Sequence, residues 1–241
     1  MAHRARNAAI GLGACALLAL PAAAPAKAPA GSVAISDEST LTRWATPEKR
    51  GKIRSWPQLH AHTVGRLRFM TEDGFPEVYL VLRRFRDSHR RRWYKIRIPG
   101  RPNGRAGWVR AWSLPLLNTV RKRLVIDRRH LRATLFRRGR RIWSSPVGVG
   151  RPSLPTPAGR FWIREKFPTS NPGGLYGPWA FGTAAYSVLT DWPGGGVVGI
   201  HGTNEPGLIP GRPSHGCVRV PNPAVVKLAR LMPVGTPLLI R

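Results

Sequence analysis

Acidic residues are scarce in this 241-residue chain, which holds 11 Asp and Glu against 40 Lys and Arg and has a formal net charge of +29. Such an imbalance indicates an anionic partner, which can be nucleic acid, an acidic membrane surface or a charged polymer. The basic residues are spread along the chain, and no helical, zinc-finger or ribonucleoprotein motif accompanies them. We therefore expect no nucleic-acid partner.

Long apolar runs are also missing. The sustained apolar stretch near the start, Ala8 to Leu20, is shorter than the roughly 20 residues that span a bilayer. Two arginines precede it, and small residues follow with an Ala-x-Ala cleavage site after Ala24 or Ala26. We expect residues 1–26 to be a signal peptide, so that the mature protein is exported and has no membrane span.

Cysteine is almost absent, with only Cys15 and Cys217 in the chain. The run Leu12–Cys15 loosely resembles a lipoprotein box, although the apolar stretch continues past it, so lipidation of Cys15 stays open. Removal of the signal peptide leaves Cys217 as the one thiol of an exported protein, which excludes an intramolecular disulfide. A buried inert cysteine is the ordinary alternative to a reactive one, and the neighbouring residues decide between them.

No helical periodicity appears in the first half of the chain. Residues 27–50 mix small and polar residues and are predicted to be a linker, and residues 51–117 are predicted to form a small all-β module. Its expected strands are Val78–Leu82, Trp93–Ile98 and Gly107–Val109, separated by Pro- and Gly-rich turns.

A second, mainly β region is predicted over residues 120–241. The expected strands are Leu124–Asp127, Ala133–Phe136, Val197–Ile200, Cys217–Val220 and Pro237–Ile240. The Gly- and Pro-rich stretch Asn171–Gly196, which holds Tyr176, Trp179 and Trp192, is predicted to form loops over a cleft.

One clear helix is expected near the C-terminus. Asn222 is a suitable N-cap, and Pro223 suits the first helical position. An apolar face follows, made of Val225, Val226, Leu228, Ala229 and Met232.

Cys217 lies beside two histidines that can activate it. A thiol near its ordinary pKa of about 8.5 is only a few per cent thiolate at neutral pH, so a nucleophilic cysteine needs a base. His215 is two residues away and cannot easily face the sulfur along an extended segment. His201 ends one predicted strand while Cys217 begins the next, and a Gly-rich hairpin between them would bring the strand tips together. Cys217 is therefore the candidate nucleophile and His201 the candidate base.

The surroundings of the pair suggest further roles. A backbone carbonyl is expected to orient His201, because the motif has no carboxylate, and the amides of Gly216 and Cys217 are a candidate oxyanion hole. Arg219 is placed to bind a substrate carboxylate. The candidate substrate-binding residues are Ser214, Arg219, Tyr176 and Trp179. A zinc site made of His201, His215 and Cys217 is the alternative, but it lacks a fourth ligand, and we expect no metal or cofactor.

Three stretches together resemble the YkuD-type L,D-transpeptidase family: His201-Gly202-Thr203, the run Ser214–Arg219 (Ser-His-Gly-Cys-Val-Arg), and Thr156–Phe161. The resemblance covers about Val120 to Arg241 and is most similar to actinobacterial members. Upstream, the run Trp93–Leu114 resembles the bacterial Src-homology-3-like domains that accompany cell-wall enzymes. The expected fold is therefore mainly β, with a small barrel followed by a β-rich catalytic domain.

The resemblance implies an acyl transfer on peptidoglycan. Cys217 would attack the L,D peptide bond of a donor stem peptide, and an amine of a neighbouring stem would resolve the thioester to give a 3→3 cross-link. His201 matches the general base of the family, and His215 and Gly216 match the region beside the oxyanion. Some members have Ser after the base, where this chain has Gly202.

The same resemblance implies a place and a class of inhibitor. We expect peptidoglycan stem peptides as partners outside the cytoplasmic membrane, with anionic wall polymers as possible further partners, and carbapenems that acylate the cysteine. Two other functions stay open at this point: an L,D-carboxypeptidase that resolves the same thioester with water, and a non-catalytic wall-binding protein.

Overall fold

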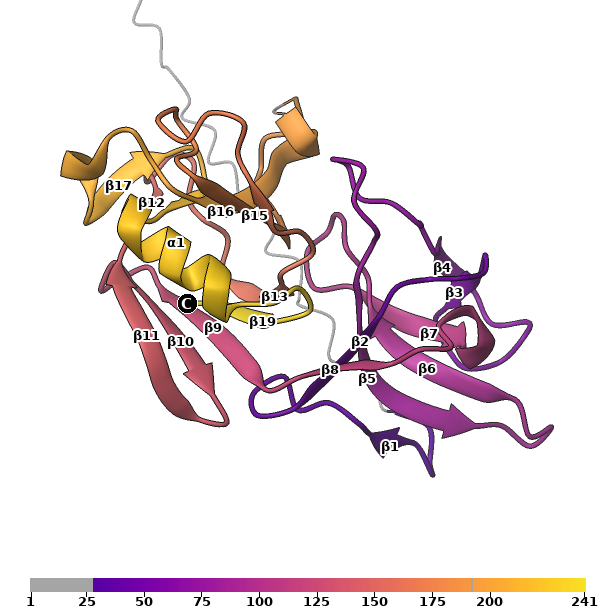
Figure 1. Cartoon of the computed structure of the whole chain (residues 1–241). Coiled ribbons are helices and arrows are strands. Elements are labelled where there is room, and N and C mark those ends of the chain that lie inside the picture. The colour runs from indigo at the N-terminus through magenta and orange to yellow at the C-terminus, as the bar shows by residue number, and fades with distance from the viewer. Residues whose placement is uncertain (1–27, 192) are drawn as a thin grey trace, which may run out of the picture.

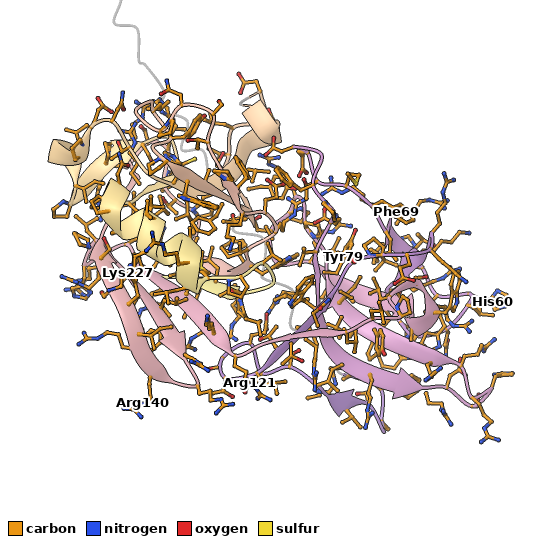
Figure 2. All side chains as sticks on the ribbon, in the orientation of Figure 1. His60, Phe69, Tyr79, Arg121, Arg140 and Lys227 are labelled. Atoms are coloured by element: carbon orange, nitrogen blue, oxygen red, sulfur yellow. The ribbon has the colours of Figure 1, made fainter. Side chains whose placement is uncertain are left out.

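Two β-rich regions lie side by side in the computed structural model, which describes residues 28–191 and 193–241 (Figure 1). The predicted signal peptide, Cys15 and Trp192 lie outside the described residues. Side chains fill the junction between the two regions, where Tyr79 lies, and His60 lies at the far end of the N-terminal region (Figure 2).

The N-terminal region is an eight-stranded sheet with the order β4-β3-β7-β6-β5-β2-β8, in which β1 also pairs with β5. Its elements are β1 (Val33–Ala34), β2 (Thr42–Ala45), β3 (Lys52–Arg54), β4 (Thr63–Arg66), β5 (Tyr79–Arg86), β6 (Arg92–Arg97), β7 (Ala106–Arg110), the 3-10 turn η1 (Ala111–Ser113) and β8 (Asn118–Val120). The predicted strands are thus present, and the Src-homology-3-like family of this region stays a prediction.

The predicted linker is wrong over part of its length. Both β1 and β2 lie within residues 27–50, and both pair with β5, so that Trp44 is opposite Leu80. Trp44 also lies directly against Gly235 of the C-terminal region, where a Cβ would collide with the indole ring. The small and polar residues of this segment suggested a linker. Its strands form only by pairing with β5, which lies far along the chain, so no local pattern indicates them.

The C-terminal region contains the other two sheets. A five-stranded sheet has the order β11-β10-β9-β19-β13, and a six-stranded sheet has the order β14-β15-β16-β18-β12-β17. Their elements are β9 (Lys122–Asp127), β10 (Arg132–Arg137), β11 (Arg140–Pro146), β12 (Gly148–Gly150), β13 (Gly159–Trp162), β14 (Phe167–Pro168), β15 (Trp179–Tyr186), η2 (Pro193–Gly196), β16 (Val197–His201), η3 (Pro206–Leu208), β17 (Gly211–Ser214), β18 (Val218–Arg219), α1 (Asn222–Leu231) and β19 (Pro237–Ile240).

The predicted fold class is confirmed, because α1 is the one α-helix among the described residues. The helix lies across the C-terminal region in yellow in Figure 1. Four of the five predicted apolar residues are buried, namely Val225, Leu228, Ala229 and Met232, while Val226 is half-buried.

The predicted N-cap is wrong. The residue before the helix is Pro221, and no side chain caps the helix there. Asn222 is the first helical residue, and its Oδ1 accepts a hydrogen bond of 2.8 Å from the Thr203 amide. Its side chain therefore connects the start of α1 to the segment that follows His201.

The prediction of loops over residues 171–196 is also wrong in part. Residues 179–186 form β15, which is buried at every position except half-buried Trp179. Its sequence of aromatic and small residues is typical of a strand that is covered on both faces.

One buried hydrophobic cluster spans both regions, and a second lies within the N-terminal region. Val78 and Leu80 of the N-terminal region belong to the same buried cluster as Phe161, Ile200 and the inner face of α1. The indole N–H of Trp162 donates a 2.7 Å hydrogen bond to the Val78 carbonyl. Neither region therefore completes its packing alone.

A buried ion cluster lies at the same junction. The Arg164 side chain is fully buried, and its Nε and Nη2 donate to the Glu77 carboxylate at 2.8 and 2.6 Å. Its remaining donors reach Glu72 at 2.9 Å and the Tyr186 hydroxyl at 3.1 Å. A bidentate arginine–carboxylate pair of this kind fixes the orientation of both partners.

We predict that Glu77→Ala destabilises the protein by about 3–5 kcal/mol, because it leaves the buried Arg164 charge without its main partner. Arg68 is the matched control: it contacts the same carboxylates, but its side chain is 45% exposed. Arg68→Ala should cost less than about 1 kcal/mol. Urea unfolding of both variants measures the difference, and equal losses would contradict the buried role of Glu77.

Candidate active site

Cys217 and His201 come together because β16 and β18 are parallel neighbours. Ile200 pairs with Val218, so Gly199 lies opposite Cys217. The predicted hairpin between the two residues is wrong. Parallel strands need a crossover connection, and here the chain passes through η3 and β17, which pairs with β12, before it returns to β18.

The Cys217 thiol and the His201 ring both lie beside Gly199. A Cβ at this position would lie 3.7 Å from Cys217 Sγ and 3.6 Å from His201 Cδ2. The Gly199 amide also points at the sulfur, with 3.4 Å between N and Sγ. Both functional groups therefore lie over the same glycine, on one face of β16.

The orientation of His201 is fixed by a backbone carbonyl. Its Nδ1 lies 2.7 Å from the Gly202 carbonyl oxygen. A carbonyl only accepts hydrogen bonds, so Nδ1 must carry the hydrogen, and in the neutral ring Nε2 keeps its lone pair. Nε2 adjoins Cδ2, the ring atom that lies beside Gly199. The histidine is thus held in the tautomer that a general base requires.

The surroundings of both partners disfavour their charged forms. It lowers the pKa of His201 to about 4, although the hydrogen bond to Gly202 acts in the opposite direction. Burial also raises the pKa of the Cys217 thiol above its usual range, against the effects of the Gly199 amide and of nearby Arg219. Both shifts favour a thiol and a neutral imidazole over a thiolate–imidazolium ion pair.

Short hydrogen bonds fix the turn that carries Cys217. The Ser214 hydroxyl donates to the Cys217 carbonyl at 2.6 Å and accepts from the Gly216 amide at 3.1 Å. Gly216 has φ of +123°, a conformation that suits glycine. Because the Gly216 amide is already bonded to Ser214, the Cys217 amide is the better candidate for an oxyanion donor. Ser214 is buried and holds the turn, and it also lines the smaller of the two cavities beside Cys217, so its contact with substrate stays a prediction.

Thr156 supports the same turn from the other side. Its hydroxyl donates to the Gly216 carbonyl at 2.8 Å and accepts from the Gly150 amide at 2.8 Å. The side chain is only 1% exposed. A Cβ at Gly150 would lie 2.5 Å from the Thr156 amide, so the two segments are in close backbone contact.

Tyr176 covers the histidine. Its ring meets the His201 ring edge to face, with 4.8 Å between the centroids. The loop that carries it is fixed by two glycines, since a Cβ at Gly177 would lie 2.6 Å from the Gly202 Cα. Gly202 itself contacts the Asn222 side chain too closely to accept a larger residue, which explains why no serine follows His201.

Two cavities meet at Cys217 and His201. A cavity of about 550 Å³ and one of about 260 Å³ share Tyr176, Val197, His201 and Cys217 in their walls. The smaller cavity also contains His215 and Arg219, whose Nη1 lies 2.5 Å from Glu205 Oε2. A substrate carboxylate would therefore have to share Arg219 with Glu205.

One predicted site residue, and the zinc site weighed as an alternative, do not fit this geometry. Trp179 lines neither cavity, and it packs instead against the hydrophobic core. Within residues 28–191 and 193–241, no three His, Cys, Asp or Glu side chains converge as metal ligands, and this applies to His201, His215 and Cys217.

Comparison with known protein families identifies the C-terminal region. Residues 121–240 match the family model of the YkuD L,D-transpeptidase catalytic domain. The chain contains a YkuD-family catalytic domain. The match covers the two C-terminal sheets and α1, together with every residue of the thiol–imidazole site.

Two curated relatives agree with this assignment. The chain is 32% identical over 119 residues to YkuD of Bacillus licheniformis, a candidate L,D-transpeptidase, and 34% identical over 103 residues to its counterpart in Bacillus subtilis. These alignments cover 49% and 43% of this chain, and 65% and 56% of the two relatives. The chain thus spans less than two thirds of the curated relatives it matches.

This chain is also similar to a solved structure. L,D-transpeptidase 3 of Mycobacterium tuberculosis, in complex with a faropenem-derived adduct, aligns with 63% of this chain and 91% of its own chain. The sequence identity is 14% and the TM-score is 0.41.

Sequence reasoning missed two residues that shape this YkuD-family site. Thr156 lies in one of the stretches that carry the family resemblance, so its motif was visible while its contact with Gly216 was not. Gly199 gave no signal of its own, because its importance depends on the register between β16 and β18.

We predict that Cys217 reacts with iodoacetamide at a rate that keeps rising with pH from about 5 to about 9, because thiolate forms only as the pH approaches the raised pKa of the thiol. Alkylation kinetics followed by intact-protein mass spectrometry measure this profile. A rate that is already constant above about pH 6 would show a thiolate–imidazolium pair and would contradict the neutral resting state.

Proposed function

We propose that this protein is a peptidoglycan L,D-transpeptidase that forms 3→3 cross-links through a thioester on Cys217. The observation that carries the proposal is the placement of Cys217 Sγ and the His201 ring beside the same residue, Gly199, with the lone pair of Nε2 left free by the Nδ1 bond to Gly202. The YkuD family of the domain supports the substrate class, since it is the family of L,D-transpeptidase catalytic domains.

The first half-reaction begins from the neutral pair. As Cys217 Sγ attacks the carbonyl carbon of the L,D peptide bond, His201 Nε2 takes the thiol proton, so the sulfur never needs to be a free thiolate. The carbonyl oxygen becomes an oxyanion, for which the Cys217 amide is the proposed donor. His201 then returns the proton to the leaving amine, the C–N bond breaks, and a thioester remains.

The second half-reaction reverses the proton path. A neutral amine of the acceptor attacks the thioester carbon, His201 removes its extra proton, and the thiol is regenerated as the amide bond forms. Two cavities that share the thiol supply one space for each peptide.

His215, Arg219 and Tyr176 are proposed to bind substrate. His215 and Arg219 lie in the smaller cavity, and Tyr176 lies between both cavities. Arg219 is proposed to hold a carboxylate of the stem peptide, which would displace the exposed Glu205 side chain from the guanidinium. Guanidinium and carboxylate groups can pair in a bidentate geometry.

We also propose that the protein acts outside the cytoplasmic membrane, where its substrate lies. The net charge of +29 supports retention by anionic wall polymers. No helix within the described part of the chain is long and apolar enough to cross a membrane.

We predict that incubating the protein with donor tetrapeptide stems and an amine acceptor yields 3→3 dimers, separated and sequenced by liquid chromatography–mass spectrometry. His201→Gln should lower the rate by about 10²–10⁴-fold, the usual effect of losing a general base. Lys227→Gln, on the exposed face of α1, should keep the wild-type rate. Shortened stems without dimers would instead identify an L,D-carboxypeptidase, and an unchanged substrate would indicate a wall-binding protein.

A further inference from the structure

The larger cavity beside Cys217 contains two carboxylates that the proposed reaction does not use. Asp73 comes from the connection between β4 and β5 in the N-terminal region, and Glu165 follows β13 in the catalytic domain. Only 11 acidic residues occur in this strongly basic chain. Two of them therefore lie together in the wall of the cavity that holds the nucleophile.

Glu165 has an unused hydrogen-bond acceptor. The residue is only 2% exposed, and its Oε2 has no hydrogen-bond partner. The carboxylate contacts β15 at Gly182, where a Cβ would be 2.5 Å from Oε2. A buried carboxylate oxygen without a donor is costly, so it indicates a ligand that supplies one.

Neighbouring groups act on the charge of Glu165 in opposite directions: Thr71 lowers its pKa, and the Asp73 carboxylate raises it. Burial, with Asp73 adding to the effect, raises the pKa of Glu165 to about 7. The nearest cation, Arg164, is already bonded to Glu77, Glu72 and Tyr186.

An apolar wall adjoins the two carboxylates. The rings of Phe75 and Phe167 stack with 5.1 Å between their centroids and 12° between their planes, and both line the same cavity. A ligand that fits here has methylene groups for the rings and a cationic end for the carboxylates. Among the described residues, no third His, Cys, Asp or Glu side chain joins the two carboxylates to form a metal site.

We propose that Asp73 and Glu165, together with the stacked Phe75 and Phe167, bind an alkylammonium side chain of a stem peptide during its reaction at Cys217. The inference rests on the proposed function of the site. It makes the N-terminal region a part of the substrate-binding surface, because Asp73 and Phe75 belong to that region. The ammonium can come from the donor or from the acceptor peptide.

The donor arm of the test compares two synthetic tetrapeptides, one with a free side-chain amine on its third residue and one with that amine acetylated. Release of the terminal amino acid reports acylation of Cys217. If the donor supplies the ammonium, Asp73→Asn and Glu165→Gln should each lower kcat/KM for the free amine about tenfold, the scale of one charge-assisted hydrogen bond. The acetylated donor should be unaffected.

The acceptor arm measures how the thioester divides between an amine acceptor and water. If the acceptor supplies the ammonium, the same variants should acylate normally, while the KM for a diamino acceptor rises about tenfold and that for a monoamino acceptor stays the same. Glu48→Gln is the matched control, since it removes an exposed carboxylate that does not line the cavity. It should behave as wild type in both arms.

Faropenem, which has no amine, separates the failure of this inference from failure of the proposed function. Wild type and both variants should form the faropenem adduct at equal rates, which also shows that Glu165→Gln is folded. If wild type forms no adduct, the proposed chemistry at Cys217 is at fault. Normal adducts with unchanged kinetics in both arms would overturn the subsite and leave the carboxylates a structural role, and Asp73→Asn alone decides this if Glu165→Gln does not fold.

Discussion

The parallel pairing of β16 with β18 is the constraint on which the site depends. It places Cys217 opposite Gly199. His201 lies two residues after Gly199 on the same face of β16, so the sulfur and the imidazole lie on one side of the sheet. A shift of one residue would turn one of the two side chains to the opposite face. The contacts of Thr156, Ser214 and Asn222 all serve to hold the segments that carry this pair.

The neutral state of the pair follows from the same packing. A site that buries both groups disfavours charge on either of them, so proton transfer has to accompany attack. The N-terminal region contributes to this enclosure: it shares a core with the catalytic domain, and its residues Asp73 and Phe75 line the larger cavity. Its strands, core and ion cluster with Arg164 therefore affect the chemistry as well as the stability.

The sequence predicted the β-rich class, the late helix and the family, because these depend on local pattern and on short motifs. It failed where long-range pairing decides. The strands β1 and β2 look like a linker until β5 pairs with them, and β15 looks like a loop because its small residues suit close packing as well as turns. The sequence predicted that a hairpin brings Cys217 and His201 together. The number of residues between them does not distinguish a hairpin from the observed crossover through β17. The acidic pair Asp73 and Glu165 gave no signal, since its members come from different regions.

The most direct test of the central claim is intact-protein mass spectrometry of the protein after exposure to a carbapenem. The thiol–imidazole pair predicts one covalent equivalent on Cys217, no adduct on Cys217→Ala, and adduct formation slowed by about 10²-fold or more on His201→Gln. A folded wild-type protein that forms no adduct, or an adduct that persists in Cys217→Ala, would contradict the account.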